Sequence, residues 1–155
     1  MPRAERPSGR GDSSRALRHP GCFACGEDNP HGLRIHYRRD GSGAFTAVWR
    51  PTSGWEGFRG IVHGGIVSTV LDEAMSKAVA ALCEALTAEL RVRFRRRVES
   101  GSAMFVRGWV TRRHKRRIQA EATLTSAEGT EHAHAWAVFL AVGDEQPEPG
   151  AAAPR

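Results

Sequence analysis

Residues 60–73, GIVHGGIVSTVLDE, decide the fold expected for this chain. Gly64 and Gly65 directly follow His63 and precede a run whose apolar side chains recur at helical spacing. These apolar residues are Val67, Val70, Leu71, Met75, Ala78, Val79 and Leu82. Because the positions between them are mostly small, the pattern predicts a long helix over about 64–83 that is buried on most sides.

The start of this predicted helix has the features of a site that binds an oxyanion. Glycine allows another group to approach the backbone closely. The first N–H groups of a helix have no intrahelical partner and lie at the positive end of its dipole. Such a helix start can therefore stabilise the negative oxygen that develops during acyl transfer.

Asp72 lies two turns further along the same helix. A carboxylate on a mostly buried helix is costly unless it has a partner or a chemical role. A structural aspartate, or one that reaches solvent at the helix edge, is the alternative. Glu73 is a rival carboxylate, but it is offset by about 100° around the helix. Glu73 also has Lys77 at i+4 as a surface partner, so Asp72 is the favoured reactive group.

The spacing between Gly64 and Asp72 bears on the assembly. Eight residues of helix separate them by roughly 12 Å, at about 1.5 Å per residue. One carbonyl group cannot contact both within a single helix. A reaction that uses both therefore needs two copies of the helix, most simply across a two-fold axis, and predicts an obligate dimer.

The remaining pattern predicts strands with a period of two. These are expected over 33–39, 44–49, 88–94, 103–112, 117–125 and 132–142, and a loop is expected over 50–60. In the strand after the helix, Leu90 and Phe94 should face the core, and Thr87 shares the parity of the polar Glu89. The order predicts an α+β fold in which an antiparallel sheet wraps around one long central helix.

At 155 residues the chain has room for one domain, expected over 19–142. Residues 1–18 predict a disordered basic tail and residues 143–155 a second disordered tail. We expect no signal peptide, because the N-terminus lacks an apolar stretch of 7–15 residues, and no membrane span, because no apolar run approaches the roughly 20 residues needed. Three cysteines are too few for a disulfide framework, so the expected location is the cytoplasm.

Taken together, these segments resemble the hotdog-fold acyl-CoA thioesterases, and most closely the phenylacetate-pathway and human thioesterase-superfamily branch. The signature is HGG at 63–65 followed by LDE at 71–73, with supporting similarity in CFACGEDNPHGL at 22–33 and TAELRVRF at 87–94. The resemblance covers about residues 20–142. It implies the hotdog fold, hydrolysis of an acyl- or aryl-CoA thioester to the free acid and CoA, and a dimer or a dimer of dimers.

The resemblance also implies roles for individual residues. Asp72 would be the nucleophile or the general base, and the Gly64 N–H would polarise the thioester carbonyl with support from His63. Thr87 would orient water or the carboxylate. Gly65 would assist at the substrate, and no metal or other cofactor is implied. Some relatives carry a polar amide where this chain has Gly57, which could shift substrate positioning to Trp55, Glu56 or Arg59; Trp55 could also line the acyl tunnel.

The net charge of +6 predicts an anionic partner. Two arginine-rich runs could hold the phosphates of coenzyme A, the alternative being a solubilising surface. Their candidate residues are Arg95, Arg97, Lys115, Arg116 and Arg117. The second run spans a hairpin, which we expect to project from the sheet edge.

Two further questions stay open at the level of sequence. The pair Cys22 and Cys25 could be half of a zinc site completed by His19, His31 or His36, although cysteines that pack a turn are the favoured interpretation. A non-catalytic CoA-ester or lipid-binding module is the alternative function. Nucleic-acid binding is disfavoured because it leaves the spacing from His63 to Asp72 unexplained.

Overall fold

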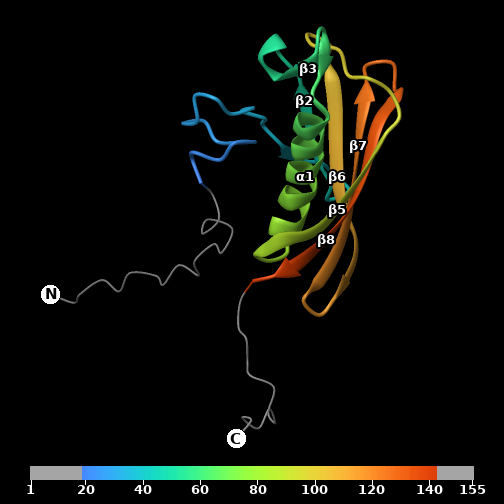
Figure 1. Cartoon of the computed structure of the whole chain (residues 1–155). Coiled ribbons are helices and arrows are strands. Elements are labelled where there is room, and N and C mark those ends of the chain that lie inside the picture. Colours follow the sequence, from blue (N-terminus) through green and yellow to red (C-terminus); the bar gives the residue numbers. More distant parts are fainter. Residues whose placement is uncertain (1–18, 143–155) are drawn as a thin grey trace, which may run out of the picture.

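The computed structural model describes residues 19–142, so both predicted tails, 1–18 and 143–155, lie outside the described residues. Within that range an antiparallel sheet of six strands, in the order β1-β2-β6-β7-β8-β5, packs on one helix, and β3 and β4 form a separate hairpin (Figure 1). The strands are β1 (Arg38–Arg39), β2 (Phe45–Trp49), β3 (Glu56–Phe58), β4 (Ile61–Val62), β5 (Ala85–Phe94), β6 (Met104–His114), β7 (Arg117–Ser126) and β8 (Glu131–Ala141). This arrangement confirms the predicted hotdog architecture.

The helix α1 (Gly64–Ala80) begins where the two glycines predict it. It ends at Ala80, about three residues before the predicted end near 83. The chain turns there, and the N–H groups of Leu82 and Cys83 both donate to the carbonyl of Val79. Leu82 is 47% exposed, so its apolar side chain matched the helical spacing without belonging to the buried face.

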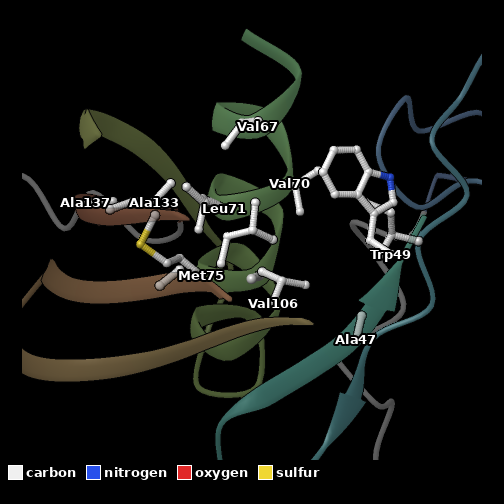
Figure 2. Close-up of a cluster of buried hydrophobic side chains, with 14 of the residues drawn as sticks. Ala47, Trp49, Val67, Val70, Leu71, Met75, Val106, Ala133 and Ala137 are labelled. Atoms are coloured by element: carbon white, nitrogen blue, oxygen red, sulfur yellow. The ribbon is translucent and has the colours of Figure 1, made fainter. Parts of the chain in front are cut away.

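The core lies between α1 and the concave face of the sheet. Figure 2 shows Val67, Val70, Leu71 and Met75 of α1 pointing toward side chains of the strands. Among the described residues the core side chains are all apolar, and Leu71, Met75 and Phe139 are among the largest that are fully buried. The apolar face that the helical spacing predicts thus packs on the sheet.

Gly108 of β6 marks the closest approach of helix and sheet. A Cβ atom at this position would lie 2.5 Å from the carbonyl carbon and oxygen of Ala74 and 2.8 Å from the nitrogen of Met75. These atoms belong to the backbone of α1, which cannot move aside as a flexible side chain could. Only glycine fits here with the helix in its observed place.

Two segments before α1 differ from the prediction. The expected loop over 50–60 contains the helix η2 (Ser53–Trp55) and the strand β3, which pairs with β4. The expected strand over 33–39 is reduced to the two residues of β1. Leu33 and Ile35 instead donate backbone hydrogen bonds to the carbonyls of Phe23 and Ala24, so this segment is bonded to the preceding loop.

The strand β5 extends over Ala85–Phe94, and its apolar residues lie on the predicted face, opposite buried alanines of β8. They are less buried than predicted. The strand lies at the edge of the sheet and pairs, among the described residues, only with β8. Leu90 is 38% exposed and Phe94 is 54% exposed, while Val92 is partly buried against the core. Alternating apolar residues indicate burial, but β5 is an edge strand and most of its apolar side chains are exposed in the single chain.

In the part of the chain that the structure describes, we find no helix with the length and apolar character of a membrane span.

Candidate active site

The start of α1 is capped by His63. The Gly65 N–H donates to Nδ1 of His63 at 2.9 Å, which fixes Nδ1 as the unprotonated nitrogen of the ring. The Gly64 N–H donates no hydrogen bond within the described residues. The two glycines therefore differ in hydrogen bonding. The N–H of Gly65 bonds the capping side chain of His63, and the N–H of Gly64 is left for another acceptor.

The His63 ring packs against Gly57 of β3. A Cβ atom at Gly57 would lie 2.9 Å from Cδ2 of His63, so the larger amide that some relatives carry would displace this ring. The backbone N–H of His63 donates to the backbone carbonyl of Trp55 at 2.9 Å. Trp55 in turn stacks on the buried Trp49, with 6.2 Å between ring centroids. Trp55 thus supports the turn that precedes α1.

Asp72 is partly buried and accepts a hydrogen bond on Oδ1 from the hydroxyl of Thr87 at 2.9 Å. Burial raises the pKa of the Asp72 carboxyl above its usual value, and the charge of Glu73 adds to the rise, while the Thr87 hydrogen bond opposes both. A carboxylate with a raised pKa and a fixed orientation is suited to accept a proton near neutral pH.

Thr87 reaches Asp72 because of an irregularity in β5. The pairing with β8 shifts between Thr87 and Glu89, so a β-bulge interrupts the alternation. Parity counted back from Glu89 had placed Thr87 on the polar face. The bulge changes the direction of Thr87 and directs its hydroxyl toward α1.

Gly64 and Asp72 do not meet within the chain. A Cβ atom at Gly64 would lie 3.4 Å from Cζ of Phe94, whereas Asp72 contacts Thr87. Phe94 and Thr87 are seven positions apart on β5, which corresponds to about 23 Å at about 3.3 Å per residue. Each half of the site thus lies near a different end of the exposed edge strand.

The predicted basic residues fall into two separate clusters. Arg95 is paired with Glu131, and Arg97 with Glu99 at 3.0 Å. These arginines and Arg96 line a cleft of about 270 Å³ that also includes Gly64 and Phe94. The first run therefore lies beside the start of α1.

The second basic cluster lies at the other end of the sheet. It occupies the turn between β6 and β7, where Lys115 has a φ of 52° and the Arg116 guanidinium donates to the carbonyl of Ala141 at 3.2 and 3.3 Å. Arg117 pairs with Leu140 of β8. Because β6 and β7 are inner strands, this hairpin projects from the end of the strands and not beside an edge strand.

The loop with the two cysteines covers Glu73 and Lys77, which were predicted to pair on the surface of the helix. Nζ of Lys77 lies 3.1 Å from a carboxylate oxygen of Glu73 and donates to Sγ of Cys25 at 3.1 Å. Burial raises the pKa of the Cys25 thiol to about 12, with a further rise from its hydrogen bond to Glu73. Sequence reasoning missed this contact, because no local spacing relates Cys25 to α1.

The candidate site lies within a segment that is similar to a known protein family. Residues 59–133 match the family model of the thioesterase superfamily, a range that contains His63, Gly64, Asp72 and Thr87. A search of curated proteins gives no significant match.

Solved structures show the same fold. One thioesterase superfamily protein is 20% identical, with a TM-score of 0.75 over 78% of this chain and 60% of its own length. The E. coli PaaI protein, from the phenylacetic acid degradation operon, is 16% identical, with a TM-score of 0.67 over 72% of this chain and 81% of its own. A hypothetical thioesterase protein with coenzyme A from Streptococcus pneumoniae TIGR4 is 13% identical, with a TM-score of 0.66 over 71% and 87%. The resemblance to the hotdog-fold thioesterase superfamily is confirmed.

Proposed function

We propose that this chain hydrolyses an acyl- or aryl-CoA thioester to the free acid and coenzyme A, with Asp72 as its reactive carboxylate. The observation that carries the proposal is the partly buried Asp72, which Thr87 orients through a 2.9 Å hydrogen bond and whose pKa is raised by burial. Similarity to the thioesterase superfamily and to a structure that contains coenzyme A supports the substrate class.

The chemistry follows from the two halves of the site. Asp72 removes a proton from water, and the resulting hydroxide attacks the thioester carbonyl carbon. The Gly64 N–H donates to the oxyanion of the tetrahedral intermediate. The C–S bond then breaks, and the coenzyme A sulfur takes the proton from Asp72. If Asp72 instead attacks the carbonyl itself, water hydrolyses the resulting anhydride and the products are the same.

A dimer formed through β5 would assemble the site. If two copies of β5 pair antiparallel with Phe94 opposite Thr87 of the partner, each Gly64 comes close to the Asp72 of the other protomer. The same pairing obeys two-fold symmetry and covers the exposed Leu90 and Phe94. It also bonds the backbone groups on the outer side of β5, the side away from β8, where the described residues provide no neighbouring strand.

This pairing also brings the two basic clusters to one end of the sheet. Arg117 is level with Leu86, since both pair with Leu140 of β8. In the antiparallel dimer Leu86 lies opposite Arg95 of the partner. The Lys115–Arg117 turn of one protomer and Arg95–Arg97 of the other then flank the same substrate entrance, where they can contact the phosphates of coenzyme A.

The test is turnover of a panel of short, medium, long and aromatic acyl-CoAs, measured by thiol release with a chromogenic disulfide. Asp72→Asn should lower kcat at least about 100-fold. Asp28→Asn, the same change at an exposed carboxylate, serves as the control. Absence of turnover with the whole panel, together with binding of the esters in a titration, would instead support the binding-module alternative.

A further inference from the structure

Three potential metal ligands converge on the side of α1 that faces away from the sheet. Sγ of Cys22, Sγ of Cys25 and a carboxylate oxygen of Glu73 lie within 4.8 Å of one another, and all three residues are partly buried. The cysteines belong to the loop before β1, which Figure 1 shows beside α1, and Glu73 directly follows Asp72. A tetrahedral Zn²⁺ site has ligands at about 2.3 Å for sulfur and about 2.0–2.2 Å for oxygen. Small side-chain rotations would bring these three atoms to such distances.

The loop backbone is shaped around the two cysteines. The Gly26 N–H donates to the carbonyl of Cys22 at 2.9 Å. A Cβ atom at Gly26 would lie 2.3 Å from the carbonyl oxygen of Pro20 and 2.4 Å from the nitrogen of Cys22. Only glycine therefore permits this turn, which directs both thiols toward Glu73.

The charges of the cluster balance around a divalent ion. Two thiolates and one carboxylate carry three negative charges, and Lys77, 3.1 Å from both Cys25 and Glu73, carries one positive charge. A divalent ion brings the sum to zero. When it binds, it replaces two thiol protons, so the net charge of this partly buried cluster does not change. Two sulfurs and one carboxylate favour Zn²⁺ over Mg²⁺ or Ca²⁺, which prefer sites made wholly of oxygen.

We propose that Cys22, Cys25 and Glu73 form a structural Zn²⁺ site that fixes the N-terminal loop to α1, with water as the fourth ligand. His19, His31 and His36, the ligands considered from sequence, place no ring nitrogen within this group of atoms. The ion holds the Glu73 carboxylate on the loop side of the helix. None of the three ligands takes part in a step of the proposed hydrolysis, although the charge of Glu73 contributes to the raised pKa of the neighbouring Asp72.

The test uses the full chain, reduced with a phosphine, freed of chelator and titrated with Co²⁺ as a spectroscopic probe. We expect thiolate-to-cobalt absorption and the visible bands of tetrahedral Co²⁺, saturating at one ion per chain and displaced by Zn²⁺. Cys22→Ser and Cys25→Ser should each weaken Zn²⁺ binding about 100-fold or more. Cys83→Ser is the matched control, because Cys83 lies after α1 and outside the cluster.

A thermal melt supplies a second readout. Zn²⁺ should raise the unfolding temperature of the wild type and of Cys83→Ser, but not that of Cys22→Ser. Reduced wild type without thiolate-to-cobalt absorption would overturn the proposal. So would a cobalt spectrum that persists in both Cys22→Ser and Cys25→Ser. Neither readout requires thioester hydrolysis, so the proposal and the proposed function can fail separately.

Discussion

The hydroxyl of Thr87 donates to Oδ1 of Asp72 at 2.9 Å, and so joins the exposed edge strand to the buried helix. This bond holds the carboxylate in one orientation and favours its ionised form, against the effect of burial. Both consequences can be measured.

Replacement of Thr87 by valine removes the hydroxyl and keeps the shape of the side chain. We expect kcat to fall about tenfold, because the carboxylate loses both orientation and a hydrogen bond. Thr87→Ser, which keeps the hydroxyl, should recover most of the activity. Steady-state kinetics of the two variants will decide; full activity in Thr87→Val together with a loss in Thr87→Ser would show that the methyl group, rather than the hydrogen bond, is what matters.

The pH dependence of kcat/KM should report Asp72. Because its pKa is raised, activity should rise with pH through an acid limb that lies above the usual aspartate value of about 3.9. Thr87→Val should move this limb to higher pH, since the hydrogen bond that lowers the pKa is gone. A limb at the same pH in both proteins would mean that another group titrates.

Asp72→Asn should stabilise the fold at neutral pH. The folded pKa of Asp72 is raised, so its charged form costs stability above that pKa, and the cost vanishes below the unfolded pKa of about 3.9. The variant should therefore unfold at a higher temperature than the wild type at pH 8. The difference should shrink as the pH falls to about 4. Thermal melts across this range check the sign, and a less stable variant at pH 8 would contradict it.

Gly64→Pro removes the backbone N–H that we assign to the oxyanion. Proline is tolerated at the first position of a helix, and His63, at φ −61° and ψ 134°, already has the conformation that precedes proline. We expect kcat to fall about 100- to 1,000-fold. Gly64→Ala adds a Cβ but keeps the N–H, and should lose far less. Circular dichroism checks that both variants are folded. Equal activities of Gly64→Pro and Gly64→Ala would exclude the Gly64 N–H from catalysis.

Mixed dimers test whether the site is shared between protomers. A heterodimer of Asp72→Asn with Gly64→Pro, purified through two different tags, contains one site with both groups intact. It should regain about half of the wild-type activity, although each parent homodimer is nearly inactive. Activity no greater than that of the parents would place Gly64 and Asp72 in the same protomer.

Local patterns predicted most of the fold. The apolar spacing of α1 and the alternation in β6, β7 and β8 predicted elements that begin and end within about three residues of those observed, because these segments pack on one core. The short pair β3 and β4 was missed, since a hairpin with only five strand residues has too little alternation to detect.

The sequence predicted individual residues of the candidate site, but not the contacts between them. His63 and Gly64 could be assigned from the features of a helix start. The bulge that directs Thr87 to Asp72 could not, because it depends on the pairing between β5 and β8. The convergence of Cys25 on Glu73 joins segments 48 positions apart, and no periodicity encodes such a contact.

The missing side chain of Gly108 has a consequence for how this protein can be altered. The backbone of α1 rests on that position, so the height of the helix above the sheet is set by the absence of one carbon atom. Asp72 is on the helix and Thr87 is on the sheet, so any residue larger than glycine there would lengthen the gap between them. Gly108 thus sets the distance between α1 and the sheet from a position outside the site. A substitution there would change how Asp72 and Thr87 are aligned.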